Sequence, residues 1–195
     1  MGRGASKAGG GSASGGGLSK GEKLEMAEHY IGPEGFEMNK YARGLDVDDF
    51  YGSKEEIAEW TKKFTKVMDE QSLGKATKVY RGASFDTVSE SLGMTPDQIK
   101  KAAMTQSGKK DIVGKTITEK GFMSTAKNMS TASSYSSGVV MTIKLPKGAK
   151  AVSQKSLTPM GEDEITVQRN SKLKITGCNY GGGKVYLECT YVDAN

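Results

Sequence analysis

Three acidic residues stand in a row in GEDEITVQRN (161–170): Glu162, Asp163 and Glu164. Polar and apolar residues alternate after them, which predicts a strand over 162–169. Side chains of a strand alternate between its faces, so Glu162 and Glu164 should share one face and Asp163 should point to the other. Two carboxylates on one face can divide labour, because one can stabilise a cationic transition state while the other moves a proton. Acidic residues are also common where a strand begins at the solvent-exposed surface, so the glutamate pair alone does not show that this is a catalytic site.

The composition narrows the chemistry that is open to this chain. His29 is the only histidine, which disfavours catalytic triads and most histidine-rich zinc sites. Cys178 and Cys189 fall on two runs that resemble the arms of one hairpin, too far offset for a disulfide, and free thiols fit a reducing compartment. The net charge of +5 is modest, and the lysine pairs are scattered over separate segments. We therefore interpret these lysines as solvent-exposed surface residues rather than as a nucleic-acid-binding surface.

The chain length predicts one folded domain behind a flexible segment. Residues 1–19 are mostly glycine, serine and alanine and read as a tail or linker. Residues 20–195 contain enough apolar residues for a core. No apolar run is long enough to span a bilayer, and the N-terminus lacks the apolar centre of a signal peptide. We therefore expect a soluble protein with no membrane partner.

Helical patterns come first along the chain and short strands follow. Helices are expected within 22–30, 35–45, 53–72 and 95–104, with a small helix or loop at 128–137. In the third helix, Ser53 and Glu56 form a capping box, and an apolar stripe (Ile57, Trp60, Phe64, Val67 and Met68) should face the core. Strands are expected at 78–82, 121–125, 138–148, 149–153, 162–169, 172–178 and 184–192. Without βαβ alternation, this order predicts an α+β fold with mostly antiparallel sheets.

Four motifs together resemble a known enzyme family. KVYRG (78–82), GFMSTA (121–126) and GEDEITVQRNSKLKI (161–175), in this order, are similar to the signature strands of mono-ADP-ribosyltransferases of the Arg-Ser-Glu class, which includes the clostridial binary actin toxins. HYIGPEGFEMNKYARGL (29–45) resembles the family's helical element. The likeness covers about residues 24–192. It implies two packed, mostly antiparallel sheets preceded by N-terminal helices, a catalytic domain over residues 20–195, NAD as co-substrate and no metal.

The resemblance implies a catalytic role for four residues. Arg81 would clamp the NAD diphosphate, since a guanidinium fork matches phosphate oxygens. Glu164 would stabilise the ribosyl cation that forms as nicotinamide leaves, and Ser124 would hydrogen-bond Glu164 and fix its orientation. Glu162 would select the acceptor: in the family, glutamate at this position accompanies arginine targets. A carboxylate can orient a guanidinium and help to remove its proton, whereas an amide cannot.

Further residues match the family's NAD site. Gly82 would let the nicotinamide amide approach the backbone, and Tyr135 stands where relatives often have a stacking phenylalanine. Tyr30 could equally belong to the core, and Asn39 could equally be a helix cap. The implied cofactor-binding set is Tyr30, Asn39, Arg81, Gly82, Ser124, Thr125 and Tyr135.

The expected function is transfer of ADP-ribose from NAD to an accessible arginine of a target protein, with NAD hydrolysis as a side activity. Water, a nucleic acid or a small guanidino compound as acceptor is one alternative, and an inactive binding module on the same scaffold is another. We expect a monomer that acts in the cytoplasm of a host or target cell, as a phage-encoded or delivered effector.

Overall fold

A computed structural model describes residues 17–193 of the chain. Residues 1–16 of the predicted tail lie outside the described residues. Three helices come first, as predicted: α1 (Lys20–Ile31), α2 (Glu34–Ala42) and α3 (Lys54–Asp69). Ser53 and Glu56 form the expected capping box, which satisfies two backbone N–H groups at the start of α3.

The N-terminal helices pack around their own apolar core. Ile57, Phe64, Val67 and Met68 of the predicted stripe are buried, together with residues of α1 and α2. Trp60 is only partly buried, and its ring stacks on His29 at 4.2 Å between centroids. The single histidine therefore has a packing contact. Phe122, far along the chain, enters this core and joins the helices to the sheets.

A five-stranded sheet carries most of the remaining structure. Its order is β1 (Thr77–Ala83), β4 (Val139–Leu145), β8 (Lys184–Asp193), β7 (Ser171–Gly181) and β2 (Thr116–Glu119). The β4–β8 pair is parallel, and the other pairs are antiparallel. A second sheet has the order β3 (Met123–Thr125), β6 (Ile165–Val167) and β5 (Ala151–Ser153), with both pairs antiparallel. The predicted α+β fold of two mostly antiparallel sheets is confirmed.

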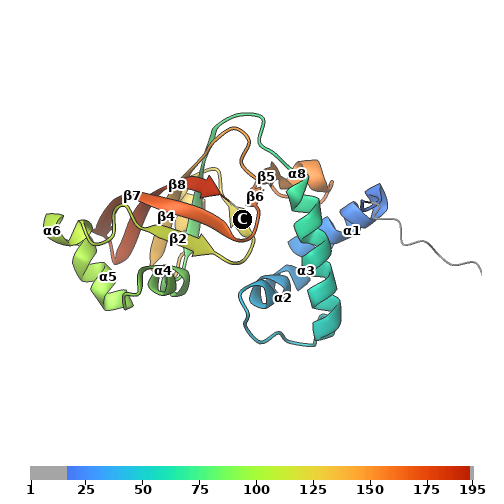
Figure 1. Ribbon diagram of the computed structural model, residues 1–195, viewed down its shortest axis with the longest axis horizontal. Helices are drawn as coiled ribbons and strands as arrows, with labels where there is room; N and C mark the ends of the chain where they lie inside the picture. Colours follow the sequence, from blue (N-terminus) through green and yellow to red (C-terminus); the bar gives the residue numbers. More distant parts are fainter. Residues whose placement is uncertain (1–16, 194–195) are drawn as a thin grey trace, which may run out of the picture.

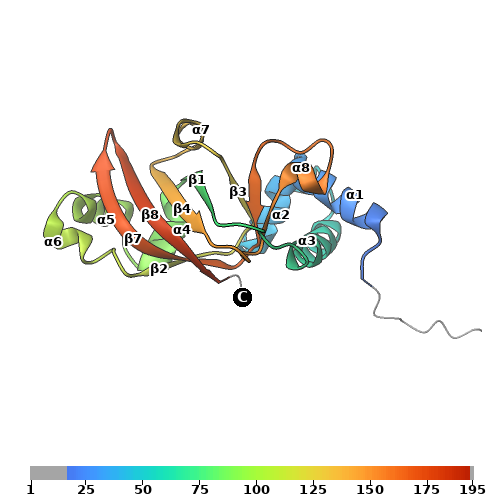
Figure 2. The same cartoon turned by 90° about the horizontal axis from the view of Figure 1, so that it is seen from above.

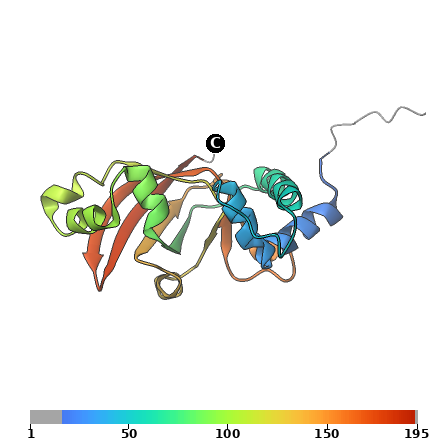
Figure 3. The same ribbon diagram turned by 90° about the horizontal axis from the view of Figure 1, so that it is seen from below.

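Short helices complete the fold: α4 (Phe85–Leu92), α5 (Pro96–Ala103), α6 (Gln106–Lys109), α7 (Met129–Ser134) and α8 (Gln154–Leu157). The helices α1–α3 lie at one end of the molecule beside the three-stranded sheet, and α5 and α6 lie at the other end against the five-stranded sheet (Figure 1; Figure 2). Seen from below, α7 projects from the sheet region between these ends (Figure 3). No helix within residues 17–193 has the length and apolar character needed to cross a membrane.

The cysteines lie on the β7–β8 hairpin, as predicted, and both are free. Cys178 is opposite Leu187, and Cys189 is opposite Ile175, so neither thiol faces the other across the ladder. Burial raises the pKa of the Cys189 thiol to about 12, which leaves it protonated and unreactive at neutral pH.

One predicted strand is shorter than expected, and this affects the glutamates. The predicted strand over 162–169 is reduced to β6 (Ile165–Val167), and residues 162–164 form an irregular segment ahead of it. Gly161 folds back onto α8 so closely that an added Cβ would lie 2.3 Å from the backbone carbon of Gln154. The strand cannot extend through this turn, so the expected alternation of faces does not apply to Glu162 and Asp163.

Candidate active site

Arg81 and Ser124 meet where the two sheets are joined. Tyr80 of β1 and Ala126, just after β3, exchange backbone hydrogen bonds of 2.8 and 2.7 Å across an isolated bridge. This bridge brings the Arg81 side chain to β3, where its Nη1 donates to the Ser124 carbonyl oxygen at 3.1 Å. The sequence separation is 43 residues. Two residues predicted from separate motifs therefore form one contact.

Tyr30 of α1 reaches the same point from the helical core. Its hydroxyl oxygen lies 3.0 Å from the Ser124 Oγ, while its ring stacks on Phe64 at 4.5 Å between centroids. Burial raises the pKa of Tyr30, so the hydroxyl stays protonated at neutral pH. Tyr30 is thus a core residue, one of the two roles that the sequence suggested. Its hydroxyl also contacts Ser124, a residue of the predicted NAD site.

Glu164 is oriented by a residue that the sequence did not single out. Gln154, the first residue of α8, donates from Nε2 to the Glu164 Oε2 at 3.2 Å. The backbone N–H of Gln154 also donates to the Glu164 carbonyl oxygen at 3.0 Å. The expected hydrogen bond between Ser124 and Glu164 does not occur among the described contacts, in which the Ser124 Oγ pairs with the Tyr30 hydroxyl. Ser124 still lies beside the segment, since it pairs with Thr166, two residues after Glu164.

The three acids differ in their surroundings. Glu162 is exposed and Glu164 is partly buried. Asp163 forms ion pairs with Lys127 at 2.6 Å and Lys155 at 3.6 Å, and the hydrogen bond from Lys127 lowers its pKa. Asp163 therefore ties the irregular segment to its neighbours, a structural contact for the acid to which the sequence gave no chemical role.

Burial raises the pKa of Glu164, and the nearby charge of Glu162 adds to this effect, while the Gln154 hydrogen bond and the Arg81 charge oppose it. A raised carboxyl pKa means that the charged form is less favourable in the folded than in the unfolded chain. Protonated Glu164 is therefore favoured in the folded chain. The stability that this protonation contributes is present at acid pH and is lost as the pH rises through the folded-state pKa.

Glu164→Gln should therefore stabilise the fold at neutral pH. Because the side chain is partly exposed, the gain should be small, about 1–3 °C in Tm for a domain of this size. Thermal unfolding followed by circular dichroism at several pH values would measure it. The gain should disappear as the pH falls below the ordinary range of a glutamate pKa, and a variant that melts below the wild type at pH 7 would contradict the assigned pKa shift.

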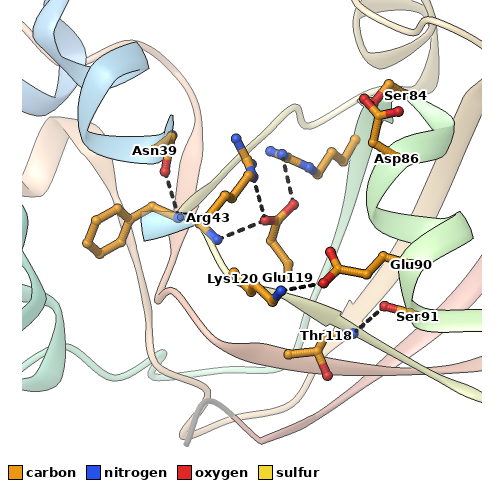
Figure 4. Close-up of polar contacts among 12 residues, drawn as sticks. Asn39, Arg43, Ser84, Asp86, Glu90, Ser91, Thr118, Glu119 and Lys120 are labelled. Atoms are coloured by element: carbon orange, nitrogen blue, oxygen red, sulfur yellow. Dashed lines mark hydrogen bonds and ion pairs between the residues drawn. The ribbon is translucent and has the colours of Figure 1, made fainter. Parts of the chain in front are cut away.

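A buried carboxylate holds Arg81 from the other side. Glu119, at the end of β2, receives a hydrogen bond from the Arg43 Nε at 3.0 Å on one oxygen and from the Arg81 Nη2 at 3.4 Å on the other. The backbone N–H of Gly121 adds a third donor at 2.8 Å. Figure 4 shows Arg43 and Glu119 joined, with Asn39 on α2 nearby. Glu119 thus places two guanidinium groups next to each other.

Glu119→Gln should lower the free energy of unfolding by about 3 kcal/mol or more, because it leaves two partly buried guanidinium groups without their counter-ion. Urea unfolding would measure the change. The matched control is Glu90→Gln: Glu90 pairs with Lys120 in the same region, but both side chains are exposed. The control should lose less than about 1 kcal/mol. Equal losses in the two variants would show that burial of Glu119 does not set its contribution.

The other predicted residues lie around this cluster. Asn39 of α2 accepts a hydrogen bond from the Phe122 N–H at 2.8 Å, which fixes the start of the β3 segment (Figure 4). Thr125 is buried, and its hydroxyl donates to the Ile165 carbonyl oxygen at 2.7 Å. The buried side chain thus links β3 to β6, so a contact between Thr125 and a ligand would have to come from its backbone.

Gly82 and Tyr135 meet at α7. A Cβ on Gly82 would lie 2.1 Å from the Ala132 carbonyl oxygen, so the space that the missing side chain leaves is filled by the α7 backbone rather than kept open for a ligand. Tyr135 caps the C-terminus of α7, and 74% of its surface is exposed. The ring has room to stack on a bound molecule.

Sequence reasoning missed Arg43, Glu119 and Gln154. Arg43 is the C-cap of α2, one turn after Asn39 and within the 29–45 segment that resembles the family, a spacing that could have indicated it. Glu119 and Gln154 gave no such signal, since single polar residues next to short strands are usual on a surface. Within residues 17–193, no group of three or more histidine, cysteine, aspartate or glutamate side chains is placed to hold a metal ion.

Comparisons with solved structures show the same fold. Plx2a, an ADP-ribosyltransferase toxin from Paenibacillus larvae, is 19% identical, with a TM-score of 0.64 over 90% of this chain and 88% of that chain. C3stau2 from S. aureus, solved with NAD, is 18% identical, with a TM-score of 0.66 over 89% and 87%. The ADP-ribosyltransferase Vis, solved with agmatine, is 17% identical, with a TM-score of 0.63 over 88% and 74%.

No match was found among curated protein sequences. The model of the ADP-ribosyltransferase exoenzyme family matches residues 15–191, nearly the whole chain. Its span includes every residue of the cluster built above. The chain therefore belongs to the ADP-ribosyltransferase exoenzyme family.

Proposed function

We propose that the protein transfers ADP-ribose from NAD to an arginine side chain of a target protein and releases nicotinamide. The observation that carries this proposal is the convergence of Arg81, Ser124 and Glu164 at the junction of the two sheets. The three residues come from separate motifs; Arg81 donates to the Ser124 carbonyl oxygen, and its charge lowers the pKa of Glu164. These two interactions support the proposal.

The residues present fit the charge pattern of NAD. Arg43 and Arg81 are held next to each other on the two oxygens of Glu119, and two adjacent guanidinium groups suit the two negative charges of a diphosphate. Arg81 would bind one phosphate, as the sequence predicts, and Arg43 would stand beside it. Tyr135, exposed at the end of α7, would offer a ring surface to the nicotinamide.

NAD brings to the site a glycosidic bond to a positively charged nicotinamide, which is a good leaving group. Glu164 would stabilise the positive charge that develops on the ribose as this bond breaks, and the interaction is stronger in the transition state than in the ground state. Gln154 and Arg81 both favour the ionised Glu164 that this role requires. The role also predicts that activity falls at acid pH, when Glu164 takes up a proton.

Glu162 would act on the acceptor. Its side chain is exposed, next to Glu164 in the irregular segment before β6, so an incoming guanidinium can reach it from solvent. A carboxylate there can accept hydrogen bonds from the guanidinium and take its proton as it attacks the ribose. This residue supports arginine as the acceptor class.

The proposal is tested by incubating the purified chain with labelled NAD and an arginine-rich protein. Label should appear on arginine residues by mass spectrometry, and the nicotinamide released should equal the sum of ADP-ribose transferred and ADP-ribose freed by hydrolysis. Label confined to other residue types would contradict the acceptor assignment, and absence of nicotinamide release would contradict the enzyme assignment.

A small guanidino compound is a second acceptor that one comparison favours. Vis, which shares this fold, was solved in complex with agmatine. Agmatine carries the same guanidinium group as arginine, so the exposed Glu162 would accept it by the same contacts. Agmatine is therefore a suitable soluble acceptor for the assays below.

A further inference from the structure

Gln154 occupies an unusual place between the two functional glutamates. It is buried, with 4% of its surface exposed, although it lies in a polar surface segment. Its Oε1 accepts a hydrogen bond from the Glu162 backbone N–H at 3.3 Å, and its Nε2 donates to the Glu164 carboxylate at 3.2 Å. One amide group therefore touches both residues.

The orientation of this amide follows from its partners. A backbone N–H can only donate, so the atom of Gln154 that faces Glu162 must be the carbonyl oxygen. An ionised carboxylate can only accept, so the atom that faces Glu164 must be the NH₂ group. The second proton of Nε2 points to the Thr166 Oγ1 at 3.2 Å. A glutamate or an aliphatic residue could not make the same set of bonds.

The backbone around Gln154 supports the same arrangement. Gln154 N–H donates to the Glu164 carbonyl oxygen, and the Thr158 N–H donates to the Gln154 carbonyl oxygen at 3.1 Å. Gly161 lies against the Gln154 backbone so closely that no Cβ fits between them. The segment between α8 and β6 is thereby folded around this one residue.

We infer that Gln154 is a positioning residue for the reaction, which fixes the Glu164 carboxylate under the ribose and sets the place of Glu162 relative to it. This inference rests on the proposed function and deepens it. Gln154 would act through the two glutamates and make no contact with the substrate. It would also link the acceptor-facing segment to the carboxylate that handles the ribose, so that one side chain affects both steps.

The charges around Glu164 predict a pH signature for this role. Burial and the charge of Glu162 raise its pKa, whereas the Gln154 hydrogen bond and the Arg81 charge lower it, and Tyr30, which faces the same point, stays neutral. Loss of the Gln154 donor removes one of the two effects that favour the ionised form. The acid limb of the pH–rate profile should then move to higher pH.

The test compares Gln154→Met with Gln168→Met. Methionine keeps the length of the side chain and removes the amide. Gln168 is a matched control: it is also buried and donates two hydrogen bonds, to the Thr65 carbonyl oxygen and the Asp69 Oδ1, but it touches neither glutamate. Both variants should lose stability to a similar degree, so any difference in catalysis reports the position of the amide.

For Gln154→Met we expect kcat for NAD hydrolysis to fall about 10- to 100-fold, the scale for a lost hydrogen bond to a charged group, with little change in KM for NAD. Transfer to agmatine should fall further, since Glu162 also loses its backbone anchor. Gln168→Met should keep the wild-type kcat and acid limb. Equal losses of kcat in the two variants, or an unchanged acid limb in Gln154→Met, would overturn the inference.

A measurement without catalysis separates this inference from the proposed function. The pKa of Glu164, followed by NMR of carboxyl carbons, should rise in Gln154→Met and stay at its wild-type value in Gln168→Met. This result is expected even if the wild type releases no nicotinamide, an outcome that would refute the proposed function alone. If Gln154→Met does not fold, Gln154→Glu serves instead. When ionised it keeps an acceptor for the Glu162 N–H and lacks the donor, so the coupled pair of carboxylates should show a titration at higher pH than Glu164 does in the wild type. An unchanged pKa in the folded variant overturns the inference.

Discussion

Glu164→Gln should abolish both ADP-ribose transfer and NAD hydrolysis, with kcat lowered by about 10³-fold or more. The amide has the size of the carboxylate but no negative charge, so it cannot stabilise the cation that forms on the ribose in either reaction. Release of nicotinamide, measured with labelled NAD with and without agmatine, would quantify both losses.

The loss of activity should not come from unfolding, because the same substitution is expected to raise Tm slightly at neutral pH. NAD binding measured by calorimetry should remain within the wild-type range, since the proposed diphosphate ligands are Arg43 and Arg81, which Glu119 holds, and not Glu164. Hydrolysis at the wild-type rate in Glu164→Gln would show that another group stabilises the transition state.

Glu162→Gln should separate the two reactions. We expect transfer to agmatine or to protein arginine to fall by about 10²-fold or more, the scale for loss of a general base, while NAD hydrolysis persists. Glu162 is proposed to act on the guanidinium of the acceptor, and water needs no such help to react with a developed cation. The ratio of ADP-ribosyl-agmatine to free ADP-ribose would give the partition directly.

Asp163→Asn provides the matched control for Glu162→Gln. It removes one negative charge from the neighbouring position, where the aspartate is paired with Lys127 and Lys155 on the surface. This variant should keep the wild-type partition between transfer and hydrolysis. A parallel loss of both reactions in Glu162→Gln would mean that Glu162 acts on the ribose rather than on the acceptor.

Local patterns in the sequence were sufficient for the main elements of the fold. Ser53 and Glu56 predicted the start of α3 because a capping box depends on residues three apart, and its apolar stripe predicted the buried face because helical periodicity is local. The sequence analysis did not predict β2 or α4, and the strand predicted over 162–169 was too long. Alternation of side chains predicted it, but the close approach of Gly161 to α8 breaks the ladder, and that approach depends on a contact between segments.

The amino-acid sequence by itself determined which residues could take part in the chemistry: Arg81, Ser124 and the Glu162–Glu164 pair are fixed by residue type and order. The tertiary structure alone decided how they are held. Glu119 meets Arg43 across 76 residues, and Gln154 meets Glu164 only because the chain turns back at Gly161. Such contacts join residues that no local periodicity relates. Their strength depends on burial, which is nearly complete for Glu119 and partial for Glu164, because a lower local dielectric strengthens a hydrogen bond to a carboxylate.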